Sequence, residues 1–434
     1  MTYSSSETRR VTVFVSAIVC LLSLNVSARL LAEPRSPVKS SSTRQVLIDV
    51  DTNTHLRHWA YTSEDRGSST RWSVRKDMLH GGRQEGVDRV RVDNGVLSFD
   101  VIPTRGMNIW DAYCGDLSLG WNSPVKEVVH PQFVNLRERG GLGWLEGFGG
   151  WMCRCGLASN GAPGEDRVRS NTGSVVPVQL TLHGKVNYLP SRHVSVEISD
   201  DDPPMIKLTG VVDETSMFGT QLRLTTEIST VAGSKSLTIR DRITNLAARD
   251  QEFQILYHTN FGSPLLEGGS RFVAPVARVT PRDVRAAEGD LSQWNVFLAP
   301  TRGYDEQVYF LKLLSDQSDN TEILLRNAAG TRGTSLSYSV KDLPHTTLWK
   351  NTAPQENGYV TGLEPATNFP NNRGFERQNG RVPSLKGGES YSAAITFTVH
   401  IDADAVQAAE ARIRTLQGET KTQIDRQPVA GLSP

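Results

Sequence analysis

The sequence has no excess of charge of either sign, because its 434 residues include 47 lysines and arginines and 47 aspartates and glutamates. This balance gives no electrostatic reason to expect nucleic acid or an anionic membrane surface as the partner. Helical periodicity is also nearly absent before residue 402. The length suits one large all-β domain or two ordinary domains.

Cysteine is scarce, and only Cys114, Cys153 and Cys155 lie beyond the N-terminal segment. Cys153 and Cys155 are too close for an easy mutual disulfide within a strand. One bridge to Cys114 and three reduced, buried thiols both fit the sequence. A lone Cys-x-Cys supplies too few ligands for zinc, so we expect no metal site.

The first residues have the layout of a secretory signal peptide. Arg9 and Arg10 precede an apolar run of about 16 residues, and residues 26–28 offer small side chains for cleavage. The run is shorter than the roughly 20 residues that cross a bilayer, which favours a cleaved signal over an anchor. We therefore expect a signal peptide over 1–28, a linker over 29–43, and export to the periplasm or secretion, without membrane attachment after cleavage.

Strand patterns fill the middle of the chain, where apolar and polar residues alternate between turn residues. We predict strands at 96–102, 175–184, 193–198, 205–212, 220–228, 235–244, 307–314, 321–326, 335–340 and 390–399. With no internal repeat and no long interior linker, the pattern predicts one antiparallel β-sandwich domain over 44–401. A helix over 402–417, capped by Asp402 or Asp404, and a disordered tail over 418–434 complete the prediction.

Three fragments place a titratable side chain at what reads as the end of a strand, among Gly, Asn or Pro. These side chains are His183, His258 and Glu364. Such positions expose a side chain at the rim of a sheet while the scaffold stays rigid. The sequence has no helical His-x-x-x-His motif and no Gly-x-Ser-x-Gly elbow. The glycine-rich stretch 140–157 lacks a phosphate-loop spacing, and its Trp144 either lies in the core or presents an aromatic face to a sugar.

Taken together, these fragments resemble motifs of the aldose 1-epimerase (galactose mutarotase) superfamily, and more closely those of its bacterial aldose 1-epimerase-like branch. "TLHGK" at 181–185 is similar to the first histidine motif of the superfamily, and "YHTNFG" at 257–262 is similar to the second. "GLEPATNFPNNR" at 362–373 resembles the glutamate motif, and the order along the chain agrees. Stretches 96–121 and 154–163 resemble two signatures of the branch, so the resemblance covers roughly residues 80–400.

The resemblance implies an antiparallel β-supersandwich of the galactose mutarotase type, and an aldose 1-epimerase that interconverts sugar anomers by acid–base ring opening. It assigns the base to Glu364 and the acid to His258, with His183 binding the substrate, a small-molecule sugar. No cofactor or metal is implied. These residue types suit the task, because histidine titrates near neutrality and a shielded glutamate can have a raised pKa. Further sugar-binding candidates are Arg105, Asn260, Asn368, Arg373 and Trp144.

Two other functions remain open from the sequence. One is a carbohydrate-binding protein without turnover, although a binding protein has no need of an acid–base trio. The other is an isomerase or lyase that acts on uronic or otherwise modified sugars with the same fold. Arg105 and Tyr257 are compatible with a lyase, which needs a base and a group that neutralises a carboxylate.

Overall fold

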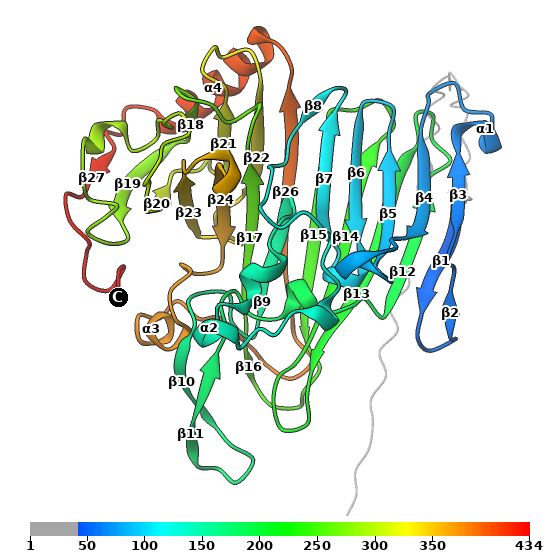
Figure 1. The fold of residues 1–434 in the computed structure, drawn as a ribbon, viewed down its shortest axis with the longest axis horizontal. Helices are drawn as coiled ribbons and strands as arrows, with labels where there is room; N and C mark the ends of the chain where they lie inside the picture. Colours follow the sequence, from blue (N-terminus) through cyan, green and yellow to red (C-terminus); the bar gives the residue numbers. More distant parts are fainter. Residues whose placement is uncertain (1–41) are drawn as a thin grey trace, which may run out of the picture. The chain divides into compact units, whose positions relative to one another are not determined.

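The computed structural model describes residues 42–434. The predicted signal peptide and nearly all of the predicted linker lie outside the described residues. Two large sheets, one of 10 and one of 13 strands, dominate the fold (Figure 1). Within residues 42–434, no helix is long and apolar enough to cross a membrane.

The 10-stranded sheet is antiparallel throughout, and its long central strands alternate buried and partly exposed residues. This alternation is the reason for the strand structure, since every second side chain faces the core. In order, the sheet contains β18 (Arg271–Val273), β21 (Asn320–Arg326), β22 (Gly333–Ser339), β26 (Ser390–His400), β15 (Ser236–Asn245), β14 (Gln221–Val231), β13 (Met205–Thr215), β12 (His193–Ile198), β1 (Thr43–Asp49) and β2 (Thr54–His55).

The 13-stranded sheet is antiparallel except at one edge, where β27 runs parallel to β19. In order, the sheet contains β27 (Gln423–Ile424), β19 (Val276–Pro281), β20 (Gln307–Leu313), β23 (His345–Asn351), β24 (Val360–Ala366), β17 (Gln254–Phe261), β9 (Met152–Leu157), β7 (Asn108–Cys114), β6 (Leu97–Ile102), β5 (Asp88–Asp93), β4 (Ser73–Met78) and β3 (Trp59–Thr62), with β8 (Leu117–Ser118) beside β7.

The core lies between the two sheets, because one apolar cluster draws residues from both of them. Val101 and Ile109 of the 13-stranded sheet belong to the same cluster as Leu224 of the 10-stranded sheet. A buried ion pair also crosses the core, with Arg154 Nε donating to Asp241 Oδ2 at 2.5 Å. The predicted all-β, antiparallel supersandwich is confirmed.

Smaller elements decorate the sheets. The hairpin of β10 and β11 lies with α2 and α3 at one end of the strands (Figure 1). These elements are α1 (Ser63–Arg66), α2 (Glu138–Gly141), α3 (Arg373–Gln378), α4 (Ala403–Gln417), the pairs β10 (Gly164–Arg169) with β11 (Val175–Leu180) and β16 (Gln251–Glu252) with β25 (Ser384–Leu385), and the 3₁₀ turns η1 (Gly82–Gln84), η2 (Pro103–Arg105), η3 (Pro131–Phe133), η4 (Gly143–Gly147), η5 (Val186–Tyr188), η6 (Leu291–Gln293) and η7 (Gln355–Asn357). Asp402 is the N-cap of α4, and its side chain accepts from Ala405 N at 2.8 Å.

The disordered tail predicted over 418–434 is wrong. Strand β27 pairs with the edge strand β19, whose outer backbone groups are free to accept a partner. Asp425 then fixes the segment, because it accepts from Arg278 Nε at 2.7 Å and from Thr280 Oγ1 at 2.5 Å. The polar residues of this segment suggested disorder, but one of them, Asp425, is the partner of an arginine far away in the sequence.

Candidate functional site

His258 and Glu364 lie side by side on neighbouring strands. The β17–β24 register pairs Thr259 with Leu363 and Leu256 with Ala366, so it places His258 opposite Glu364. Side chains that are directly opposite and on one face are in contact range. His258 Nε2 lies 3.2 Å from Glu364 Oε1, and both side chains are almost completely buried.

The two side chains lie within their strands and not at strand ends, which corrects the sequence-based prediction of a rim position. Every residue of β17 and of β24 is buried. Pro365 reads as a strand breaker, yet β24 continues through it and pairs it with Thr346 on the other side. A proline has no N–H to donate, and the ladder pairs between β17 and β24 lie on either side of Glu364 and Pro365.

His183 approaches the pair from a loop. The predicted strand over 175–184 ends at Leu180, and His183 adopts a positive φ of 56°. Its ring centroid lies 5.4 Å from that of His258. Nδ1 of His183 lies 2.8 Å from the backbone oxygen of Asn160, which can only accept, so Nδ1 carries the hydrogen. The Nε2 atom of a neutral His183 is therefore an acceptor.

An aromatic cluster surrounds the two histidines. The ring of Phe148 lies 5.2 Å from that of His258, and the ring of Trp349 lies 5.4 Å from it. Trp144 of η4 lies 4.7 Å from His183 and 6.2 Å from His258, and it is completely buried. The predicted aromatic residue Trp144 is thus part of the wall around the histidines.

Burial sets the protonation of the trio. It raises the pKa of Glu364 to about 8, an effect that Glu306 strengthens and Arg282 opposes. Burial lowers the pKa of His183 to about 4. It also lowers the pKa of His258 well below the usual value, and neighbouring His183 adds to this effect. Near neutral pH these shifts favour a protonated carboxyl group beside two neutral imidazoles.

The remaining predicted residues are bonded mainly to protein. Asn260 contacts His258, with its Oδ1 2.7 Å from Nδ1. Asn368 exchanges two amide hydrogen bonds with Asn160, at 2.9 and 3.0 Å, and thereby supports the carbonyl that holds His183. Arg373 donates to Asp166 Oδ2 at 2.7 Å, which ties α3 to β10.

Arg105 lies in η2, with its side chain buried. Its guanidinium lies over the ring of Tyr188 at 4.6 Å and near Trp110 at 5.3 Å. Its Nε and Nη1 atoms have no hydrogen-bond partner within the described residues. The cation is thus held by aromatic faces.

Besides Trp349, three further residues near the site are absent from the sequence-based prediction. Glu306 has a half-exposed carboxylate that accepts from Trp349 Nε1 at 2.8 Å and from Arg282 Nη2 at 3.2 Å. Asn160 holds His183. Gly362 lies where a side chain would meet Glu364. Only Gly362 has a local signal, since a glycine inside a strand often marks a close approach.

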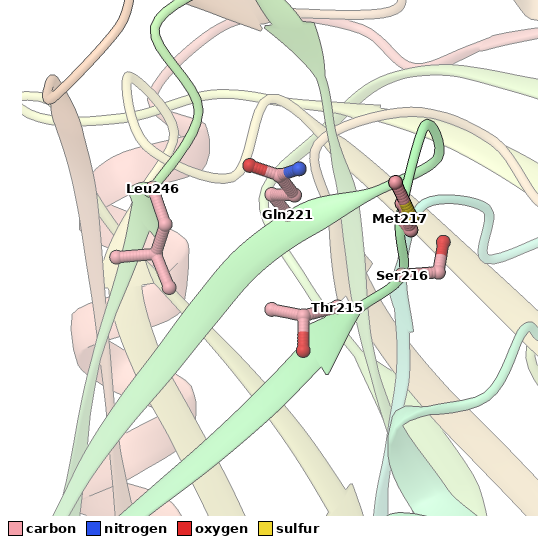
Figure 2. Close-up of a pocket in the computed structure, with 5 residues that line it drawn as sticks. All are labelled: Thr215, Ser216, Met217, Gln221 and Leu246. Atoms are coloured by element: carbon pink, nitrogen blue, oxygen red, sulfur yellow. The ribbon is translucent and has the colours of Figure 1, made fainter.

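Other features of the described chain do not add chemistry to the site. Residues 42–434 contain no group of three His, Cys, Asp or Glu side chains that could hold a metal ion. Cys114, Cys153 and Cys155 are buried, and their thiols are free. A hollow of about 410 Å³ lies at the β13–β14 turn. Figure 2 shows the residues that line it, Thr215, Ser216, Met217, Gln221 and Leu246. It contains no titratable side chain and none of the site residues.

Comparisons with known proteins agree with the fold. Residues 84–399 match the family described as a domain of unknown function (DUF4432). The crystal structure of a candidate aldose 1-epimerase from Klebsiella pneumoniae subsp. pneumoniae MGH 78578 is 36% identical, with a TM-score of 0.84 over 90% of this chain and 99% of that chain. A galactose mutarotase-like protein from Clostridium acetobutylicum is 14% identical, with a TM-score of 0.51 over 80% of this chain and 99% of that chain. No curated protein matches the sequence.

Proposed function

Because the chain belongs to the aldose 1-epimerase (galactose mutarotase)-like superfamily and to its DUF4432 family, we propose that it is an aldose 1-epimerase that interconverts sugar anomers. The observation that carries the proposal is the contact of 3.2 Å between His258 Nε2 and Glu364 Oε1. It brings a basic nitrogen and a carboxyl group to one point, in reach of the two oxygens on an anomeric carbon. His183 stands beside them.

Ring opening needs two proton transfers. A base takes the proton from the anomeric hydroxyl, the C1–O1 bond gains double-bond character, the bond from C1 to the ring oxygen breaks, and an acid protonates the ring oxygen. Rotation of the aldehyde about C1–C2 and the reverse steps give the other anomer. Each proton transfer contributes about 10²–10⁴-fold to the rate.

The resting protonation state must change before this reaction begins. At rest the proton is on Glu364 and His258 is neutral. Transfer of this proton from Glu364 Oε1 to His258 Nε2, over 3.2 Å, produces a carboxylate and an imidazolium. The carboxylate of Glu364 then accepts the proton of the anomeric hydroxyl, and Nε2–H of His258 protonates the ring oxygen. His183, with Nδ1 donating to Asn160, presents Nε2 as an acceptor for a sugar hydroxyl.

The surroundings suit a neutral sugar. The rings of Phe148 and Trp349 lie near His258, and Glu306 adds a carboxylate that can accept hydroxyl hydrogens. Arg282 pairs with this carboxylate at 3.2 Å, so Glu306 presents an ion pair rather than a free negative charge to the substrate.

Anomer exchange tests the proposal directly. Exchange is followed by NMR on a panel of neutral aldoses, with Glu364→Gln, His258→Asn and the exposed-site control Glu356→Gln. We expect the first two variants to lose at least about 10²-fold in kcat while sugar binding survives, and the control to match the wild type. A wild-type protein that binds sugars without accelerating exchange would instead favour a binding protein.

A further inference from the structure

We propose that Asn260 is a positioning residue that holds His258 as its Nδ1–H tautomer, so that Nε2 and Glu364 share a single mobile proton. The inference deepens the proposed function and rests on it, because this proton is the one that would move during ring opening. It assigns to Asn260 a task other than the binding of sugar hydroxyls predicted from the sequence.

The orientation of the Asn260 amide is fixed by two carbonyl groups. Its Nδ2 donates to the backbone oxygen of Gly150 at 3.0 Å and to that of His258 at 3.1 Å. A carbonyl oxygen can only accept, so the NH₂ end of the amide must point there. Asn260 is completely buried, and water does not compete for these contacts.

The amide oxygen of Asn260 therefore faces the ring of His258. Oδ1 lies 2.7 Å from Nδ1, and an amide oxygen has no hydrogen to donate. Nδ1 must carry the hydrogen. The spacing explains the contact, since residues two apart in a strand point to the same face of the sheet.

The remaining nitrogen of a neutral His258 is bare and faces Glu364. Two bare acceptors 3.2 Å apart in a buried site would leave both groups without a hydrogen-bond partner, which is unfavourable. One proton therefore lies on the line between Nε2 and Oε1. The opposite tautomer would point Nε2–H at Glu364 and leave Nδ1 facing another acceptor.

The groups around the pair decide which atom holds the proton at rest. His183 disfavours a charged His258, and Glu306 disfavours a charged Glu364, whereas Arg282 has the opposite effect on Glu364. Cys153 and Cys155 also face the pair from β9, and burial raises the pKa of each thiol, which keeps both neutral. Together with burial, these neighbours favour a neutral pair with the proton on Glu364.

The first test is NMR of the full chain labelled with ¹⁵N at its nine histidines, with His258→Asn used to assign the signals of His258. We expect a protonated Nδ1 and an unprotonated Nε2 for His258 near neutral pH. The Nε2–H tautomer in the wild type would overturn the inference. This readout needs no sugar and no turnover, so it separates failure of the inference from failure of the proposed function.

The second test compares Asn260→Leu with Asn260→Asp. Both variants lose the two NH₂ donations to the Gly150 and His258 carbonyls, but only the leucine removes the acceptor for Nδ1–H. In anomer exchange we expect Asn260→Leu to lower kcat by about 10²-fold or more with little change in KM, and Asn260→Asp to stay within about 10-fold of the wild type. The exchange rate of Asn260→Asp should also have a shifted pH profile, because the new carboxylate makes His258 more basic.

Equal losses in the two variants would show that Asn260 serves only the scaffold. Where Asn260→Leu does not fold, the tautomer in the wild type and in Asn260→Asp still decides the question, because both retain an acceptor for Nδ1–H.

Discussion

The substitution Gly362→Ala, which adds one methyl group, should disrupt the contact between His258 and Glu364. A Cβ atom at this position would lie 2.5 Å from Glu364 Oε1, 3.1 Å from His258 Cε1 and 3.2 Å from Trp349 Cε3. Non-bonded carbon contacts are optimal at about 3.5–4.0 Å. Gly362→Ala therefore forces a shift of the carboxylate by roughly 1 Å.

The expected effect of Gly362→Ala combines two opposing contributions to stability with one effect on the rate of anomer exchange. Replacing a strand glycine by alanine stabilises by about 0.4–1 kcal/mol when nothing clashes, because the unfolded chain loses entropy. Overpacking a buried site costs about 1–3 kcal/mol, so the net change should be destabilising. The contact between His258 Nε2 and Glu364 Oε1, at 3.2 Å, is already at the long end for a hydrogen bond. Its loss should reduce anomer exchange by about 10²-fold or more.

The assay pairs thermal unfolding with anomer exchange measured by NMR. Gly120→Ala is the matched control, because Gly120 is also buried and its Cβ would meet only Trp151 Cβ, at an ordinary 3.9 Å. We expect the control to keep its exchange rate and its Tm, whereas Gly362→Ala loses the rate and a few degrees of Tm.

A Gly362→Ala variant with the exchange rate and Tm of the wild type would refute the reasoning. It would mean that the space beside Glu364 is larger than the structure indicates, or that the pair of His258 and Glu364 is not where the chemistry occurs. Equal damage from Gly120→Ala would point to a general intolerance of the sheet to alanine at buried glycines.

Three further predictions concern stability, each measured by urea unfolding. The folded-state pKa of Glu364, about 8, lies above the ordinary 4.5, so its stabilising contribution is complete below pH 4.5 and is lost as the pH rises through about 8. The free energy of unfolding of Glu364→Gln, relative to that of the wild type, should thus rise by roughly 1 kcal/mol per pH unit across this window. A difference that does not change with pH would contradict the raised pKa. Asp166→Asn removes the buried carboxylate that Arg373 and Arg377 share, and because Arg377 keeps its pair with Glu252 the cost should be about 1–3 kcal/mol; a neutral effect would argue against the network. Asp425→Asn weakens the bond to Arg278 and should lower stability by about 1 kcal/mol, whereas no change would speak against a docked C-terminal segment.

The β-sandwich could be predicted because alternating apolar and polar residues are visible within each short stretch of sequence. In β14, Leu222, Leu224 and Ile228 alternate with polar residues, and the structure buries all three. The strands β17 and β24 lack this alternation, because both of their faces are buried. Their polar residues then read as turn chemistry, and His258 and Glu364 were predicted at strand ends.

The surroundings of the site depend on contacts between distant segments, which one sequence does not display. Glu306 reads as an ordinary surface glutamate, and only the folded sheet brings it to the indole of Trp349. Asn368 reads as a sugar-binding amide, yet its partner Asn160 lies 208 positions earlier in the chain. The end of the chain is another example, since Asp425 meets Arg278 across 147 positions.

The pairing of β17 with β24 makes a wrong register of these two strands energetically unfavourable. If the two strands slipped by one position, Glu364 would turn from its polar neighbours into the apolar layer between the sheets. A carboxyl group without a partner there costs several kcal/mol, comparable with a sizeable part of the whole stability of a protein. A misaligned chain would thus be both inactive and unstable. Selection for the reaction and selection against wrongly assembled molecules would then act on the same two side chains.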